Sequence, residues 1–265
     1  MKILVKIGGT LLDSPESRHR LASEIATASE QGAQIVVVHG GGKQMTRYLT
    51  DHGIESRFVN GLRVTTPEVL DAVVKVLAGS VNQDLVSAFI ACGVPAVGLS
   101  GMDALLTEAR QLDPELGWVG KPIRSDARLL DSLIQLKYIP VVACLAGDRQ
   151  GRFFNVNADQ MAVSVAGALH ADKLLFLTDV DGVKDANNVV YSTLNIEQCR
   201  NLVDSGIATG GMRAKLESAI EAFETGTGEV VIAPGAVPGI ISKLVIGGNA
   251  GTRIVAASAA GMNHA

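Results

Sequence analysis

The stretch Ile35-Val-Val-Val-His39-Gly-Gly-Gly42 decides how the rest of the chain can fold. Its β-branched residues predict a strand buried on both faces, as in the interior of a parallel sheet. Residues 43–52 place Met45, Tyr48 and Leu49 at helical spacing, so the glycines form a turn from a strand into a helix. Backbone N–H groups in such a turn can approach a bound anion, because glycine has no Cβ and the helix begins with a positive end. A tight turn that merely needs positive φ values explains these residues equally well.

Composition and charge limit the class of protein. Of the 265 residues, 47% are hydrophobic and only 4% aromatic, and 29 are glycine, which suits buried parallel strands covered by helices. The net charge of −4 and the lack of any Lys/Arg run argue against a nucleic-acid partner. No stretch looks like a membrane span, and Met1 leads directly into a strand without a signal peptide. The three cysteines are far apart and odd in number, which indicates a reducing compartment. We therefore expect a cytoplasmic protein with no membrane partner.

A lysine within the first predicted strand, residues 2–7, indicates a site. Lys6 must be paired or reach a ligand if the strand is central, and Gly8-Gly9 follow where ligands bind at the carboxyl end of a parallel sheet. An edge strand with Lys6 in solvent is the alternative. A helix over residues 15–30 follows, which completes a βαβ unit with the strand that ends at His39.

Residues 56–66 alternate around Asn60-Gly61 and predict a hairpin. Arg63 follows the turn, and a guanidinium fixed on a rigid ribbon suits capture of a carboxylate. On spacing alone, a surface arginine is the favoured explanation. The helix predicted over residues 67–92 is apolar around much of its circumference, which places it inside the protein or at a subunit contact.

The remaining pattern alternates strands and helices. We predict strands over residues 95–99, 139–145, 174–178, 229–233 and 252–256, helices over 127–137, 158–169 and 195–205 and from 212, a hairpin excursion over 101–126, and a frayed tail after 257. The predicted fold is α/β, with an open, mainly parallel sheet between helices and two lobes sharing one continuous sheet. Residues 1–172 form the first lobe and residues 173–265 the second.

Two helix starts carry polar residues of interest. Asn157 is a natural N-cap with Gln160 three residues on, and Asp159 is favoured by the helix dipole; this explains both without a ligand, but it leaves Asn155 unexplained. Arg213 and Lys215 are predicted in the first turn of the helix from Met212, where cations are disfavoured by about 0.3–1 kcal/mol each. That conflict indicates a bound phosphate or carboxylate.

Common nucleotide and metal motifs are missing from the sequence. No G-x-x-x-x-G-K-[ST] occurs, and no G-x-G-x-x-G opens a helix, which counts against a Rossmann dehydrogenase. The aspartates of Asp179-Val-Asp-Gly-Val183 do not fit an EF-hand loop, because no terminal Glu follows at the required position.

Taken together, six motifs resemble the amino acid kinase superfamily and, within it, the N-acetylglutamate kinases. The motifs lie in that family's order over nearly the whole chain: Lys6-Ile-Gly-Gly9, Val38-His-Gly-Gly-Gly42, Asn60-Gly-Leu-Arg-Val-Thr65, Asn155-Val-Asn-Ala-Asp-Gln160, Thr178-Asp-Val-Asp-Gly-Val183 and Gly211-Met-Arg-Ala-Lys215. The resemblance implies ATP-dependent phosphorylation of the γ-carboxylate of N-acetyl-L-glutamate in arginine biosynthesis, with Mg²⁺ held mainly by the ATP phosphates and water and without an assigned protein ligand.

The resemblance also implies a role for each matching residue. Lys6 and Lys215 stabilise the transferring phosphoryl group, and Asp159 holds the two lysines. Arg63 and Asn155 bind the α-carboxylate of the substrate. Backbone N–H groups face phosphate oxygens and the reacting end of the substrate at Gly8, Gly9, Gly41 and Gly42. The nucleotide is lined by Asp179, Val180, Asp181, Gly182, Val183 and Lys184 and by Ile207, Ala208 and Thr209.

Departures from the family pattern shape the remaining expectations. Arginine-inhibited relatives have a helix before the first strand and a characteristic segment near the C-terminus, neither of which this sequence resembles. We therefore expect a homodimer with weak or no feedback by arginine. The alternatives are a kinase for a carrier-bound aminoadipate, a non-catalytic amino-acid-sensing module on the same fold, and, more distantly, a nicotinamide enzyme.

Overall fold

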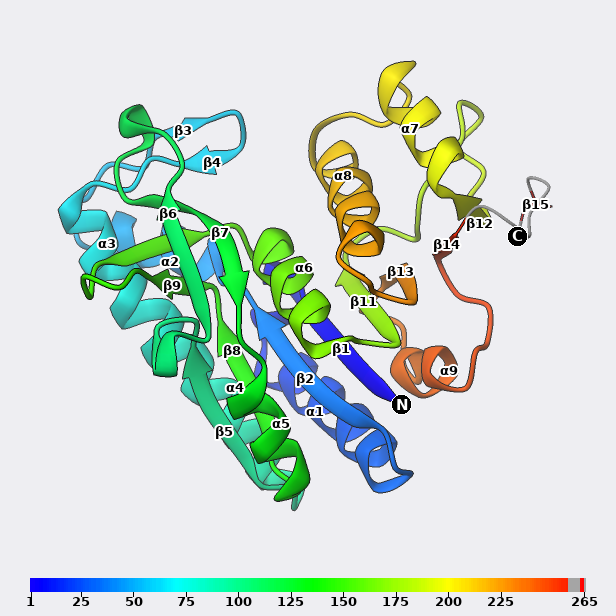
Figure 1. The fold of residues 1–265 in the computed structure, drawn as a ribbon, viewed down its shortest axis with the longest axis horizontal. Helices are drawn as coiled ribbons and strands as arrows, with labels where there is room; N and C mark the ends of the chain where they lie inside the picture. The colour runs from blue at the N-terminus through cyan, green and yellow to red at the C-terminus, as the bar shows by residue number, and fades with distance from the viewer. Residues whose placement is uncertain (257–262, 265) are drawn as a thin grey trace.

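A nine-stranded sheet forms the centre of the protein (Figure 1). The computed structural model describes residues 1–256 and 263–264. The order across the sheet is β15 (Asn263–His264), β12 (Tyr191–Asn195), β14 (Thr252–Val255), β13 (Glu229–Pro234), β11 (Lys173–Thr178), β1 (Lys2–Ile7), β2 (Gln34–His39), β8 (Ile139–Ala143) and β5 (Ala96–Ser100). Neighbouring strands run parallel except at β13–β14 and β12–β15. The predicted open, mainly parallel and continuous sheet is confirmed.

The central strands are buried because their side chains are apolar on both faces. Residues 35–38 of β2 are each at most 2% exposed, as the β-branched run predicts. Strand β1 lies between β2 and β11, so Lys6 is on a central strand and the edge-strand alternative is wrong. Residues 173–178 pair with β1 directly, which means that the predicted boundary between the lobes at residue 172 lies inside one sheet.

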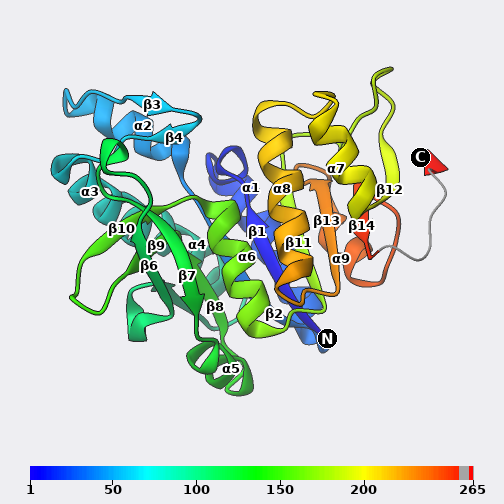
Figure 2. The ribbon, with the colours of Figure 1, turned by 45° about the horizontal axis from the view of Figure 1, so that its top comes forward.

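Helices cover both faces of the sheet (Figures 1 and 2). On one face α1 (Pro15–Glu30) contacts α4 (Asn82–Ala91) and α9 (Ile240–Val245), and on the other α8 (Gly210–Glu224) contacts α6 (Ala158–Leu169) and α7 (Ile196–Asp204). The shorter helices are α2 (Gly42–Asp51) and α5 (Arg128–Gln135). Helix α9 and strand β12 were not expected from the sequence, because both are short and their periodicity is weak.

The long apolar helix is not uniform. It consists of α3 (Pro67–Val73), a π-helical segment η2 (Val74–Val81) and α4. By length and composition alone, Pro67–Ala91 could cross a membrane, with a mean hydropathy of 1.3, contrary to our expectation that no stretch has this property. In the structure it packs against α1 and β5, which is the position of a helix that covers a sheet.

The excursion over residues 101–126 is a hairpin, as predicted, and it joins a second small sheet. Strands β6 (Thr107–Gln111) and β7 (Val119–Ser125) pair antiparallel and form a closed four-stranded barrel with β9 (Leu145–Gly147) and β10 (Phe153–Val156). Two 3₁₀ turns, η3 (Asp103–Leu105) and η4 (Pro114–Leu116), flank β6. The predicted strand 139–145 is therefore wrong as one element. The chain leaves the main sheet at Cys144, whose carbonyl accepts the N–H of Val156 at 3.1 Å.

The short elements near the glycine turns are as expected, with small shifts. A 3₁₀ turn, η1 (Gly9–Leu12), follows β1, and the hairpin of β3 (Phe58–Val59) and β4 (Leu62–Arg63) turns at Asn60-Gly61. Helix α8 begins at Gly210, two residues earlier than predicted. The tail after residue 257, predicted to fray, lies outside the described residues except for 263–264.

Candidate active site

The functional residues gather where the carboxyl ends of the parallel strands meet. The register aligns Lys6 of β1 with Val38 of β2 and with Phe176 of β11, so the turns after these three strands lie at one edge of the sheet. Gly8-Gly9, Gly40–Gly42 and Asp179 all follow at that edge. This is the position at which open parallel sheets bind ligands.

A carboxylate between two lysines forms the centre of this edge. Asp159, in the first turn of α6, has Oδ1 2.7 Å from Nζ of Lys6 and Oδ2 3.2 Å from Nζ of Lys215. Lys6 is 8% exposed and Asp159 is 7% exposed. Burial alone would raise the pKa of Asp159, but the two ammonium groups outweigh burial and hold that pKa below its usual value. Asp159 is therefore ionised at neutral pH and holds together cations from β1 and α8.

Local structure explains how Asp159 reaches this position. Asn157 caps α6, since its side-chain oxygen accepts the N–H groups of Asp159 at 2.8 Å and Gln160 at 3.3 Å. The predicted N-cap is confirmed. The capping interaction accounts for the helix start, but it does not account for the contact of Asp159 with two lysines from distant parts of the sequence.

The prediction for the start of α8 was partly wrong. Because the helix begins at Gly210, Lys215 lies in its second turn, and Arg213 points outward to Glu217 with Nε 2.8 Å from Oε1. The conflict between two cations and the helix dipole is therefore weaker than the sequence indicated. Only Lys215 takes part in the buried cluster, through its contact with Asp159.

The glycine turns at the same edge of the sheet carry backbone N–H groups without an acceptor in the described part of the chain. Within residues 1–256 and 263–264, the N–H groups of Gly9, Gly41 and Gly42 donate to no backbone or side-chain acceptor. The N–H of Gly8, by contrast, donates to the carbonyl of Leu177 at 2.9 Å, so the expectation that it faces a phosphate is wrong. Gly8 is needed for close approach instead, because a Cβ there would lie 3.0 Å from that same oxygen.

Arg63 lies on β4 and is held from several sides. Its Nη1 donates to Oγ of Ser56, and its Nη2 donates to Oγ1 of Thr46 at 2.8 Å and to the carbonyl of Gly42 at 3.3 Å. Its guanidinium also lies 4.6 Å from the ring centroid of Phe58. Arg63 is 9% exposed, and burial lowers its pKa. The interpretation as a surface arginine is wrong.

No acidic residue in the described part of the chain pairs with Arg63. Every acceptor that it reaches is a neutral oxygen. A buried cation without a carboxylate partner is costly unless an anion joins it. Arg63 is therefore placed and charged for an anionic ligand.

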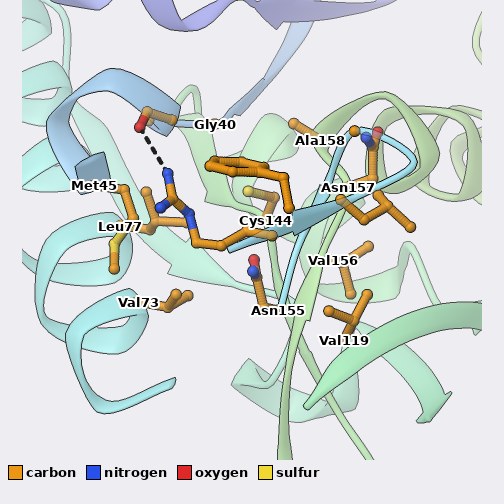
Figure 3. Close-up of a pocket in the computed structure, with 16 residues that line it drawn as sticks. Gly40, Met45, Val73, Leu77, Val119, Cys144, Asn155, Val156, Asn157 and Ala158 are labelled. Carbon is orange, nitrogen blue, oxygen red and sulfur yellow. Dashed lines mark hydrogen bonds between the residues drawn. The ribbon is translucent and has the colours of Figure 1, made fainter. Parts of the chain in front are cut away.

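Arg63 and Asn155 line one cavity of about 200 Å³ together with Gly41 and Gly42 (Figure 3). Most of its other walls are apolar, including the labelled Val73, Leu77, Val119 and Val156. Asn155 donates from Nδ2 to Oγ1 of Thr65 at 3.0 Å, which fixes the orientation of its amide. The cavity thus suits a small ligand that has an anionic group and an apolar part.

The sequence did not single out two residues at this cavity, one on its wall and one behind it. Cys144 lies on its wall where the chain leaves the main sheet, and burial raises the pKa of its thiol to about 11, so it is an unreactive apolar surface. Thr65 is fully buried behind Asn155. Neither stood out, because a small residue after a strand and a threonine in a hairpin are common without any function.

A second cavity, of about 600 Å³, begins where the first ends. The two share Gly61, Leu62 and Asn157, and the second continues past Asp159 and Lys215 to Gly210 and Gly211 of α8. The lysine–aspartate cluster therefore borders a space that connects to the Arg63 cavity. A ligand that fills the second space would lie next to Asp159 and Lys215.

The residues predicted to line a nucleotide lie at the same sheet edge but form no common cavity with Arg63. Asp179–Lys184 form the turn after β11, and Ile207–Thr209 precede α8. Val180 and Ile207 are exposed apolar side chains at 38% and 44%. Gly182, Val183 and Ala208 are buried, so only their backbone can face a ligand. The N–H of Val183 is already used by Oγ1 of Thr252 at 2.8 Å.

Among the described residues, no group of three or more His, Cys, Asp or Glu side chains is arranged to hold a metal ion. The site instead offers cations and N–H groups, which suit the oxygens of a phosphate.

Comparison with known proteins agrees with this geometry. Residues 1–234 match the amino acid kinase family. A protein of Solibacter usitatus named acetylglutamate kinase is 57% identical over 257 residues, which cover 97% of this chain and all of that protein. Another of that name, from Koribacter versatilis, is 42% identical over 88% of this chain and 90% of its own. The structure of an N-acetylglutamate synthase from Neisseria gonorrhoeae, complexed with coenzyme A and N-acetyl-glutamate, superposes with a TM-score of 0.86 at 27% identity. The match covers 97% of this chain and 60% of the synthase.

Proposed function

The chain belongs to the amino acid kinase family, and we propose that it transfers the γ-phosphoryl group of ATP to the side-chain carboxylate of N-acetyl-L-glutamate. The observation that carries this proposal is the Lys6–Asp159–Lys215 cluster beside a cavity that contains the unpaired cation of Arg63. The high identity to proteins named acetylglutamate kinase supports this substrate and a role in arginine biosynthesis.

The chemistry needs no general base from the protein. A carboxylate is ionised at neutral pH, so its oxygen attacks the γ-phosphorus without losing a proton. The new bond joins that oxygen to phosphorus, the bond from the γ-phosphorus to the β–γ bridging oxygen breaks, and ADP leaves with the electron pair. The products are an acyl phosphate and ADP. We therefore assign no residue as a general base, and the carboxylate of Asp159 serves only to hold the two lysines.

The protein's part in that step is positioning and charge neutralisation. Lys6 and Lys215 are the catalytic residues in this proposal, because Lys215 lines the second cavity and Lys6 contacts Asp159, which lines that cavity too. Asp159 is a positioning residue that holds both. The N–H groups of Gly9, Gly41 and Gly42 donate to oxygens of the phosphates and of the attacking carboxylate.

Substrate choice comes from the first cavity. Arg63 binds the α-carboxylate, and Asn155 donates its remaining N–H or accepts through Oδ1 beside it. The apolar walls accommodate the acetyl group and the methylenes of the substrate. The alternative substrate, a carrier-bound aminoadipate, would need an open path for its carrier, and free aminoadipate represents it in the test below.

The nucleotide lies over residues 179–184 and 207–209 in this proposal. The exposed side chains of Val180 and Ile207 supply apolar surface for the base, and the turn after β11 supplies backbone groups. Magnesium arrives as part of the Mg·ATP substrate, held by its phosphates and water, since the described residues offer no metal cage.

We also propose a lobe division, an assembly and a compartment. Residues 1–172 form the acyl-substrate lobe and residues 173–265 the nucleotide lobe. A C₂ homodimer packs across the segment Pro67–Ala91, where only 39% of the apolar window is buried within one chain and Ile90 is 56% exposed. Free cysteines suit a cytoplasmic enzyme. Light scattering tests the dimer, and a monomeric mass would contradict it.

The test of function is acyl phosphate formation by the purified chain. Hydroxylamine converts an acyl phosphate to a hydroxamate, which separates this product from ATP hydrolysis. N-acetyl-L-glutamate, glutamate and aminoadipate are compared side by side at equal Mg·ATP. Hydroxamate from N-acetyl-L-glutamate in clear preference supports the proposal, whereas none from any substrate, with the chain folded, would refute it.

A further inference from the structure

Two buried polar residues behind the glycine turn have no part in the proposed chemistry. His39, at the end of β2, is fully buried, and Asn82, the first residue of α4, is 1% exposed. Nδ1 of His39 lies 2.8 Å from the carbonyl oxygen of Gly40, and Nε2 lies 2.9 Å from Nδ2 of Asn82. The two side chains therefore form a chain of contacts from α4 to the glycine turn.

The partners fix the direction of each hydrogen bond. A carbonyl oxygen only accepts, so Nδ1 of His39 carries the hydrogen and Nε2 accepts from Asn82. The amide of Asn82 is fixed in turn, because Nδ2 also lies 2.9 Å from the carbonyl of Val141. A protonated His39 would set Nε2–H against that amide N–H. Burial lowers the pKa of His39 to about 4, so the ring is neutral at pH 7.

The surrounding backbone is shaped to admit this pair. A Cβ on Gly98 of β5 would lie 2.0 Å from Oδ1 of Asn82, so only glycine leaves room for the amide. The π-helical segment η2 ends at Val81, directly before Asn82. Leu77 of this segment packs against Gly41, where a Cβ would lie 2.6 Å from Cδ2 of Leu77. Such segments change the phase of a helix and are frequent at functional sites.

The contact with Gly40 determines where the next amide points. The Gly40–Gly41 peptide is planar and trans, so holding the carbonyl of Gly40 toward His39 turns the N–H of Gly41 away from it. Gly40, Gly41 and Gly42 all line the Arg63 cavity, whereas His39 and Asn82 do not. The imidazole thus orients the N–H of Gly41 through its hydrogen bond to the carbonyl of Gly40, on the side away from the cavity.

We propose that His39 and Asn82 are positioning residues that orient the Gly40–Gly41 peptide so that the N–H of Gly41 meets the attacking carboxylate. This inference rests on the proposed function, because it assigns that N–H a partner in the acyl-transfer step. It deepens the proposal because it explains what orients the Gly40–Gly41 peptide, although glycine residues on their own allow many backbone conformations.

Two variants of His39 test the contacts of its two ring nitrogens separately. His39→Asn places an amide nitrogen near the position of Nδ1, so it can still donate to Gly40, while His39→Gln reaches the position of Nε2 and loses that contact. Both remove the ring. We expect kcat with N-acetyl-L-glutamate to fall on the order of 100-fold in His39→Gln but by no more than about tenfold in His39→Asn. In both variants the KM for ATP should stay within about twofold of the wild-type value.

Two controls separate positioning from a general loss of stability. Asn195→Ala removes the N-cap of α7, far from the glycine turn, and lowers the Tm without lowering kcat. The double variant His39→Gln/Asn82→Ala should have a kcat only slightly below that of His39→Gln alone, because both substitutions break the same chain of contacts. Equal kcat values for the two His39 variants, corrected for the folded fraction, would overturn the inference.

A measurement on the wild-type protein keeps the inference testable if the variants do not fold. The ¹⁵N shifts of the imidazole report which ring nitrogen carries the hydrogen, and we expect the Nδ1–H tautomer for His39 at pH 7. The Nε2–H tautomer would overturn the inference even in an active enzyme. Conversely, the expected tautomer in a protein that does not phosphorylate N-acetyl-L-glutamate would place the failure in the proposed function.

Discussion

Replacing Arg63 by alanine tests the substrate site most directly. The guanidinium has five N–H donors, and its contacts with Ser56, Thr46 and the carbonyl of Gly42 use three of them. Two donors remain for a ligand, and no carboxylate of the described residues competes for them. Arg63→Ala therefore removes the ligand's charged partner and leaves only neutral hydroxyl and carbonyl oxygens behind.

The expected loss follows from those two free donors. A hydrogen bond to a charged group contributes about 1.5–3 kcal/mol, and truncating one partner of a buried charged pair costs about 2–5 kcal/mol. Water can enter the space of the removed side chain and solvate the substrate carboxylate, so we expect about 2–4 kcal/mol. That corresponds to a rise in the Kd for N-acetyl-L-glutamate of about 30-fold to 700-fold.

Calorimetric titration of both substrates measures this effect. Mg·ATP should bind Arg63→Ala with nearly unchanged affinity, because the residues predicted to line the nucleotide lie outside the Arg63 cavity. Arg63→Lys is the matched control, since it keeps the charge but loses the planar fork, and its affinity should lie between those of wild type and Arg63→Ala. If ATP affinity fell by the same factor as N-acetyl-L-glutamate affinity, Arg63 would belong to the nucleotide site or to the fold, and the reasoning would be refuted.

Three further outcomes follow from the buried charges. Lys215→Ala should lower kcat on the order of 100-fold to 1,000-fold with a smaller change in KM, and an unchanged kcat in a steady-state assay would remove Lys215 from catalysis. Asp159→Asn leaves Lys6 buried without its carboxylate, so denaturant titration should show a loss of about 3–5 kcal/mol of unfolding free energy, while a neutral effect would mean that the cluster is already solvated. Because the folded-state pKa of His39 is about 4 against an unfolded value of 6.5, only the unfolded state gains this proton as the pH falls from 6.5 to 4. Wild type should thus lose up to about 3 kcal/mol more stability over that range than His39→Asn does, a difference absent above pH 7 and readable from denaturation at each pH.

The sheet could be predicted from the sequence because its strands are unusually uniform. The β-branched run ending at His39 and the apolar strands over residues 2–7 and 174–178 are buried on both faces, so composition alone reveals them. The break at Cys144 could not be predicted, since residues 139–147 are apolar throughout and either sheet can bury them. Which sheet takes each half depends on pairing partners that are distant in the sequence.

Site residues were predictable where a local pattern is unusual. Lys6 stood out because a lysine in an apolar strand is rare, and Gly41-Gly42 because they follow a buried strand. The pairing of Lys6 and Lys215 with one carboxylate could not be derived locally, since it joins β1, α6 and α8. Arg213 was predicted to be part of the site for the same reason as Lys215, yet it pairs with Glu217 at the surface. The sequence does not distinguish such an exposed i,i+4 pair from a member of the cluster around Asp159.

The contacts of Asp159 explain how two positive charges can lie close together at this site. Lys6 is held at 2.7 Å and is nearly buried, whereas Lys215 is held at 3.2 Å with a side chain that is 17% exposed. Without Asp159, the buried ammonium group of Lys6 would be an uncompensated charge, which is costly in the interior of a protein. Asp159 therefore compensates both positive charges, and in our proposal the remaining N–H groups of the two lysines meet the charge that develops during transfer. The longer contact lies on α8, in the lobe that we propose binds the nucleotide, so we expect Lys215 to adjust to a bound phosphoryl group more readily than Lys6, which lies on a central strand.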